Sequence, residues 1–96
     1  MPNIYYTEPA LLDLDKIHQT YARYAQANAD KRINGLSDMF EFIARMPLMG
    51  RARDDLLPGI RMHVYKGHVI FYSLLEDGIV IERLASPGQD PDRFFG

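Results

Sequence analysis

The feature of this chain that most restricts its fold is a change in the spacing of its apolar residues at Pro47. Before Pro47 the apolar residues recur every three or four positions, which places them along one side of an α-helix. After Pro47 they alternate with polar residues or form short continuous runs, as expected of β-strands. Proline itself stops a helix, because it has no backbone N–H and its ring clashes with the preceding turn. The sequence therefore predicts a helical half followed by a half made of strands.

The helical half contains two periodic runs. The first can be capped at its start by Thr7 and should end near Ala27 or Asn28. Its apolar residues are Leu11, Leu14, Ile17, Tyr21 and Tyr24. The apolar residues of the second run are Ile33, Leu36, Phe40 and Ile43. Two helices joined by a few residues must run antiparallel, so residues 8–46 are predicted to form a helical hairpin with a shared apolar side.

Strand-forming segments stand on both sides of this hairpin. Ile4–Tyr6 precedes it. Three further segments, separated by a Lys-Gly and an Asp-Gly pair, should form an antiparallel meander. They are Ile60–Tyr65, His68–Leu75 and Ile79–Leu84. The second of them is almost continuously apolar, as expected of a central strand covered on both faces. The predicted fold class is α+β, with the order strand, helix, helix, three strands, and with the hairpin on one face of a small antiparallel sheet.

Length and composition limit what such a chain can do. Ninety-six residues form one domain, which we expect to span residues 1–96. The sequence has no cysteine, so it forms neither disulfides nor thiolate metal sites, and we expect a cytoplasmic protein. No apolar run approaches the roughly 20 residues that span a bilayer. A net charge of −2 argues against a general nucleic-acid binder. We expect no metal and no cofactor.

The basic residues are concentrated in one region. Five cations, Arg45, Arg51, Arg53, Arg61 and Lys66, lie among only two acidic residues, Asp54 and Asp55. Arg51 and Arg61 are candidates for binding a carboxylate or phosphate, because guanidinium groups bind both in a bidentate manner. For Arg53 we expect pairing with one of the two aspartates. Met62 belongs to a group of methionines that suits either an adaptable binding surface or ordinary core packing.

Residues that often carry catalysis are present but poorly arranged. His63 and His68 flank the predicted Lys-Gly turn without a third ligand nearby in sequence, so we interpret them as surface histidines rather than a zinc site. Asp13 and Asp15 are predicted to lie on the helix surface, where no burial raises the pKa of a carboxyl group. The sequence therefore offers no positive evidence of an enzyme.

Several motifs together resemble the ParE branch of the ParE/RelE toxin superfamily. They are Pro47-Leu48-Met49-Gly50-Arg51-Ala52-Arg53, Pro58-Gly59-Ile60-Arg61, His68-Val69-Ile70-Phe71-Tyr72, and Asp77-Gly78-Ile79-Val80-Ile81-Glu82-Arg83-Leu84 with Asp90 beyond. The resemblance covers essentially the whole chain. It implies the toxin of a type II toxin–antitoxin system, neutralised by a ParD-like antitoxin that wraps around it. DNA would then be contacted only through the antitoxin complex.

Two mechanisms occur among proteins of this fold. ParE-type toxins poison DNA gyrase by binding, whereas RelE-type relatives cut messenger RNA on the ribosome, so the site must decide between them. The nucleases use basic and proton-transferring groups on the central strands and near the C-terminus. The corresponding positions here hold Val69, the segment 86–89 and Phe94 or Phe95. We therefore expect a gyrase inhibitor that is not an enzyme.

The candidate residues for binding the target or the antitoxin lie mainly in the strand half and the tail. They are Arg51, Arg53, Arg61, Met62, Arg83, Asp90, Phe94 and Phe95. One alternative is a degenerate RelE-like ribonuclease that uses Arg51, Arg61 and Arg83. The other is a non-toxic binding module that regulates its own operon together with the antitoxin, because the segment 86–89 also departs from the ParE pattern.

Overall fold

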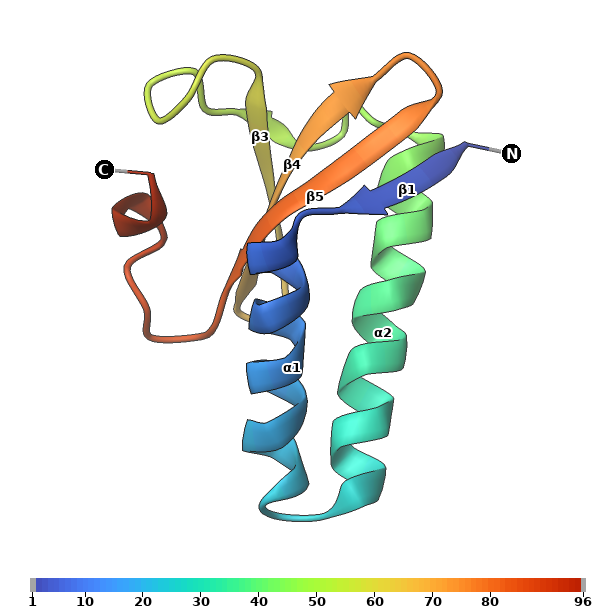
Figure 1. The fold of residues 1–96 in the computed structure, drawn as a ribbon, viewed down its shortest axis with the longest axis vertical. Coiled ribbons are helices and arrows are strands. Elements are labelled where there is room, and N and C mark those ends of the chain that lie inside the picture. The colour runs from blue at the N-terminus through green and yellow to red at the C-terminus, as the bar shows by residue number, and fades with distance from the viewer. Residues whose placement is uncertain (1, 96) are drawn as a thin grey trace.

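A computed structural model describes residues 2–95 of the chain. The elements in chain order are β1 (Asn3–Tyr6), α1 (Glu8–Ala22), α2 (Gln26–Arg45), β2 (Arg51–Ala52), β3 (Ile60–Tyr65), β4 (His68–Leu75), β5 (Gly78–Ala85) and a 3₁₀ helix, η1 (Pro91–Phe94). Figure 1 shows the helical hairpin extending from one end of the sheet, with η1 on the side of the sheet away from α2. The predicted α+β class and element order are confirmed. None of the helices in the described residues combines the length and apolar character needed to cross a membrane.

The five strands form one mixed sheet in the order β1-β5-β4-β3-β2. The last three strands form the antiparallel meander that the sequence predicted. The sheet is not purely antiparallel, however, because β1 pairs in parallel with β5. A parallel pair needs a long connection, which the hairpin and the meander supply here. Strand β2 is a two-residue addition within the predicted connector, and it pairs with β3 at the other edge.

The helices differ from the prediction at the turn between them. The Thr7 hydroxyl accepts a hydrogen bond from the Ala10 N–H at 3.1 Å, so the predicted N-cap is confirmed. Helix α1 ends at Ala22 rather than near Ala27, and α2 already begins at Gln26. Tyr24 continues the apolar spacing of α1, but it lies in the turn and is 83% exposed. Its position matches the helical period, but most of its ring faces solvent instead of the core.

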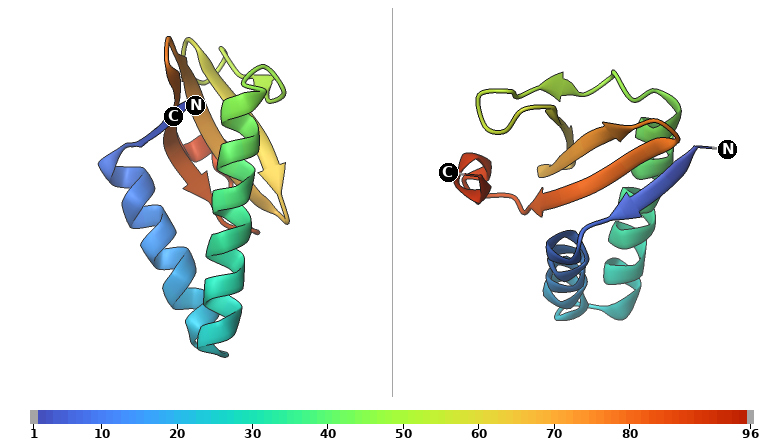
Figure 2. Two further views of the ribbon diagram at one scale, coloured as in Figure 1. Left: turned by 90° about the vertical axis from the view of Figure 1, so that its right-hand side faces the viewer. Right: turned by 45° about the horizontal axis from the view of Figure 1, so that its top comes forward.

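The hydrophobic core lies between the hairpin and one face of the sheet, as predicted (Figure 2). Helix α2 contributes three of its four predicted apolar residues as fully buried side chains. These residues are Leu36, Phe40 and Ile43. They pack in one cluster with Ile70 and Tyr72 of β4, and with Ile79 and Ile81 of β5. Helix α1 buries Ala10, Asp13 and Ile17, whereas Leu11 remains 52% exposed.

The opposite face of the sheet is also covered along β4. Because successive residues of a strand point to opposite faces, Phe71 lies on the face away from the core cluster that holds Ile70 and Tyr72. Phe71 is nevertheless fully buried. The Phe95 ring packs edge-on against it, with the ring centroids 4.9 Å apart. The prediction that β4 is covered on both faces is therefore confirmed at Phe71, where the second cover is the C-terminal tail, whereas Leu74 and Leu75 at the end of the strand are exposed.

Candidate functional site

We define the tail face as the side of the sheet around Phe71 that the C-terminal segment covers. Met62 on β3 and Arg83 on β5 are the cross-strand neighbours of Phe71, and such neighbours share one face of a sheet. The Arg83 guanidinium carbon lies 4.2 Å from the centroid of the Phe94 ring, a cation–π contact. Phe94 and Phe95 thus rest on adjacent strands and hold the tail against the sheet.

Arg53 connects this tail to the segment before β3. Its guanidinium group donates two hydrogen bonds to Asp55, at 3.0 and 2.9 Å, and one to Asp92 in η1 at 3.2 Å. A fourth contact reaches the Met62 sulfur at 3.2 Å. The hydrogen bonds from Arg53 lower the pKa of Asp55, and the same pairing raises the pKa of Arg53. The predicted pairing of Arg53 with a neighbouring aspartate is confirmed.

Arg83 forms a second charged contact, which the sequence did not predict. The side chain donates to the two carboxylate oxygens of Asp13 on α1 at 2.8 and 3.1 Å. These hydrogen bonds raise the pKa of Arg83. Asp13 also accepts a bond from the Leu84 N–H at 3.0 Å. Strand β1 ends opposite Ile81, so it offers no partner to the Leu84 N–H further along β5. The Asp13 carboxylate accepts that hydrogen bond instead.

The prediction that Asp13 lies on the surface was wrong, since the residue is 8% exposed. Its spacing of three from Ala10 and four from Ile17 puts it on the buried side of α1. The sequence did contain a signal for this burial, namely a carboxylate on the apolar side of a helix. Such a group is buried only when a hydrogen-bonding or charged partner is present.

The remaining candidate residues have separate places. Arg61 lies beside Tyr72, on the face that carries the helices, and donates to the carbonyl oxygens of Leu48 and Gly50 at 3.1 and 2.6 Å. It therefore holds the connector rather than the tail face. Arg51 is exposed on β2, opposite Met62. The Asp90 carboxylate caps η1 by accepting from the Asp92 N–H at 3.1 Å.

The structure thus brings six of the eight candidate residues to the tail face and tail. They are Arg53, Met62, Arg83, Asp90, Phe94 and Phe95. Arg51 flanks them at the sheet edge, and Arg61 lies on the opposite face. The cations of this face are engaged by carboxylates and by an aromatic ring, an arrangement suited to binding and to holding the tail rather than to proton transfer.

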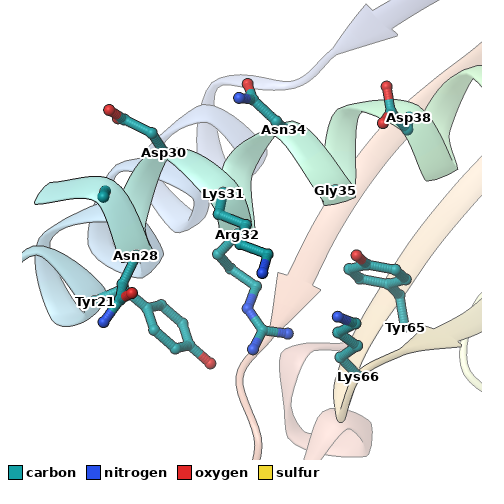
Figure 3. A pocket seen from close by; sticks show the side chains of 11 residues that line it. Tyr21, Asn28, Asp30, Lys31, Arg32, Asn34, Gly35, Asp38, Tyr65 and Lys66 are labelled. Atoms are coloured by element: carbon teal, nitrogen blue, oxygen red, sulfur yellow. The ribbon is translucent and has the colours of Figure 1, made fainter. Parts of the chain in front are cut away.

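The structure also contains a cleft that the sequence analysis did not predict. Its lining residues include Tyr21, Arg32 and Lys66 (Figure 3). The prediction that His68 lies on the surface was wrong, because this residue is 1% exposed. Its Nε2 lies 3.4 Å from the Tyr21 hydroxyl oxygen. Burial, and then the nearby Arg32 charge, lower the pKa of His68. The burial of His68 could have been predicted from its position at the start of the apolar run 68–75.

Metal-ligating groups are dispersed over the part of the chain that the structure describes. Within residues 2–95 no three His, Asp or Glu side chains lie close enough together to hold a metal ion. His63 pairs across the strands with Ile70 and His68 pairs with Tyr65, so the two histidines are not directly opposite each other, and His68 is buried.

Comparisons with known proteins agree on one family. A family model described as "ParE toxin of type II toxin-antitoxin system, parDE" matches residues 4–91. Toxin ParE3 of Caulobacter vibrioides is 28% identical over 85 residues, which cover 88% of this chain and 85% of that toxin. Toxin ParE1 of Mycobacterium tuberculosis is 29% identical over 75 residues, covering 77% and 76% of the two chains. Among solved structures, one titled "Chromosomal ParDE TA system from P. aeruginosa" has the same fold. Its TM-score is 0.75 at 20% identity, over 91% of this chain and 97% of that one.

Proposed function

The chain belongs to the ParE toxin family of type II toxin–antitoxin systems, and on that premise we propose that a ParD-like antitoxin neutralises it and that it inhibits DNA gyrase by binding. We further propose that it acts in the cytoplasm, is not an enzyme, and contacts DNA only through the antitoxin complex. The family match along residues 4–91 is the observation that carries this proposal.

The arrangement of the arginines favours binding over RNA cleavage. The alternative nuclease would need Arg51, Arg61 and Arg83 around one phosphate. Arg61 is bound to backbone carbonyls on the helix-bearing face, whereas Arg83 is paired with Asp13 and stacks on Phe94. The two guanidinium groups therefore do not converge. A charged phosphorane needs several groups aimed at one position, and this chain lacks that constellation among its described arginines.

The antitoxin has two sheet edges and an apolar segment available to it. Strands β1 and β2 are the two edges of the sheet, and both residues of β2 are exposed. Edge strands present unpaired backbone groups to which an extended peptide can add a strand. Met46 and Leu48, between α2 and β2, are 57% and 69% exposed. An antitoxin that adds a strand at β2 would also cover this apolar segment.

The target would meet the tail face and its rim. Arg93 in η1 is 86% exposed along its side chain, and its bond to Asp90 is long at 3.6 Å. Arg51 is exposed at the neighbouring edge. Arg51 is exposed and Arg93 is only loosely paired with Asp90, so both can reach an acidic surface, whereas Arg53 and Arg83 are held by aspartates.

The test measures gyrase supercoiling with the purified chain, alone and with its antitoxin. We expect inhibition that the antitoxin relieves, and weaker inhibition by the Arg93→Gln variant. Arg45→Gln is the matched control, because Arg45 ends α2 on the side away from η1 (Figure 1). Gyrase that stays fully active, together with ribosome-dependent cleavage of messenger RNA, would establish the nuclease instead. An inert chain that only strengthens promoter binding by the antitoxin would identify the regulatory module.

A further inference from the structure

A cleft of about 860 Å³ lies between the connected ends of α1 and α2 and the turn that joins β3 to β4. Tyr21 lines it from α1, residues 27–38 contribute from α2, and Tyr65 and Lys66 close it from the turn. None of the eight candidate residues discussed above contributes to its walls. Ligand pockets of this size, about 300–1,000 Å³, accommodate small molecules such as nucleotides.

Positive charge converges on this cleft. Three cations line it, namely Lys31, Arg32 and Lys66. Figure 3 shows Arg32 extending from α2 into the space in front of the turn that carries Lys66. The two lining carboxylates, Asp30 and Asp38, point away from that space on the other side of α2. Asp30 is also occupied elsewhere, because its Oδ1 lies 3.1 Å from the Gln26 amide and 3.3 Å from His18.

Arg32 is the central group of this cluster. Its guanidinium carbon lies 4.8 Å from the Tyr21 ring centroid, a cation–π contact that holds the side chain against the ring. Among the residues that the structure describes, its Nη1 is buried and has no hydrogen-bond partner. Arg53 and Arg83, by contrast, each pair with an aspartate. A guanidinium held in place without an acceptor is prepared for an oxyanion.

The backbone conformation at Lys66 and the environment of His68 also suit a cleft that binds an anion. Lys66 has a φ of 47°, so the tight turn fixes the point from which its side chain extends. His68 contacts the Tyr21 hydroxyl through Nε2, and burial followed by the Arg32 charge lowers the pKa of His68, which favours its neutral form around pH 7. The cleft therefore presents three positive charges, of which Arg32 is held against Tyr21, and together they match a phosphate dianion better than a single carboxylate does.

We propose that this cleft binds a small phosphate-bearing ligand of nucleotide size, whose phosphate is held by Arg32 together with Lys31 and Lys66. The site is separate from the tail face and requires neither the antitoxin nor gyrase. A phosphate bound beside Arg32 would offset the positive charge that disfavours protonated His68, so occupancy should raise the pKa of that imidazole.

The experiment titrates the full-length, ¹⁵N-labelled chain with AMP and with inorganic phosphate at constant ionic strength, followed by NMR. We expect saturable shifts at Arg32, Lys66 and Tyr21, and an upward move of the His68 pKa. Tighter binding of AMP would identify a nucleotide as the source of the phosphate, and equal binding would identify free phosphate. A titration with sodium glutamate at the same ionic strength tests whether the cleft binds a carboxylate as well as it binds a phosphate.

Variants assign the binding to these residues. We expect Arg32→Gln to weaken AMP binding by about tenfold or more. Lys66→Asn should weaken it several-fold while preserving the turn, because asparagine tolerates a positive φ. Arg45→Gln removes the same charge from the far end of α2 and should bind as the parent does. The proposal is overturned by non-saturating shifts up to about 10 mM ligand, by equal binding of glutamate, or by a folded Lys66→Asn variant with parental affinity.

Discussion

At the scale of single residues, Asp13 links the hairpin to the sheet. Its carboxylate accepts two hydrogen bonds from Arg83 and one from the Leu84 N–H. The carboxylate is 9% exposed and the Arg83 side chain 29% exposed, so the pair is partly shielded from water. Removing one member of such a pair costs more than the pair contributes, because the other member remains without its partner.

We predict that Asp13→Ala lowers the free energy of unfolding by about 3 kcal/mol. Asp13→Asn should cost less, about 1–2 kcal/mol, because the amide oxygen still accepts from the Leu84 N–H. Urea denaturation of the two variants and the parent measures the difference. Equal losses in both variants would show that the backbone bond to Leu84 contributes nothing.

His68 makes stability depend on pH. Its pKa in the folded chain is lowered, first by burial and then by Arg32, whereas in the unfolded chain it lies near the ordinary value of about 6.5. Below about pH 6.5 the unfolded chain therefore binds a proton that the folded chain does not bind, and the free energy of unfolding falls as the pH falls. This loss ends once the pH passes the folded pKa.

We predict that His68→Gln flattens the slope of stability against pH between about pH 5 and 7. Urea denaturation at a series of pH values measures this slope. His63→Gln is the control, since it removes a histidine from the neighbouring strand and leaves His68 in place. If the slope survives in His68→Gln, another group is responsible for it.

At the scale of elements, the turn between β3 and β4 determines how the cleft is closed. Lys66 and Gly67 have φ values of 47° and 82°, which match the two-residue hairpin turns that follow the twist of the strands. A Cβ added at Gly67 would lie 3.0 Å from the Pro87 side chain. The turn therefore packs against the segment after β5 as well as joining two strands.

We predict that Gly67→Ala destabilises the chain more than Gly59→Ala does. Both glycines have a φ of 82°, so both variants carry the cost of about 1 kcal/mol for a left-handed alanine. Nothing lies within 4 Å of a Cβ at Gly59, so only Gly67→Ala must also displace Pro87. Thermal unfolding of the two variants isolates this contact, and equal melting temperatures would mean that Pro87 moves freely.

At the scale of the whole molecule, the parallel pair β1–β5 joins the first strand of the chain to the last. Gly78 is the cross-strand neighbour of Asn3, and the Asn3 N–H donates to the Asp77 carbonyl oxygen at 2.8 Å. A Cβ at Gly78 would overlap the Asn3 carbonyl oxygen, which is a backbone atom. Only glycine therefore allows β1 to lie at this position.

We predict that Gly78→Ala detaches β1 while the antiparallel strands remain paired. Hydrogen exchange should show lost protection at the Thr7 N–H, which donates to the Ile81 carbonyl oxygen, and retained protection along β3 and β4. Loss of protection throughout the sheet would instead make β1 part of a single cooperative unit.

Much of this architecture is visible in the order of the residues. The spacing of Leu36, Phe40 and Ile43, the cap at Thr7 and the Lys-Gly turn indicate the helices, the hairpin and the meander. These features depend on neighbours a few positions away, so local sequence determines them. The pairing of Arg53 with Asp55 was predictable for the same reason.

Only the tertiary structure decided which distant groups meet. Asp13 and Arg83 are 70 residues apart in the sequence, and Tyr21 and His68 are 47 residues apart. No local sequence pattern therefore predicts either contact. The parallel place of β1, the burial of His68 and the separation of Arg61 from Arg83 likewise follow from how the hairpin packs on the sheet. Periodicity shows which side of an element is apolar, whereas partners are chosen when the elements pack.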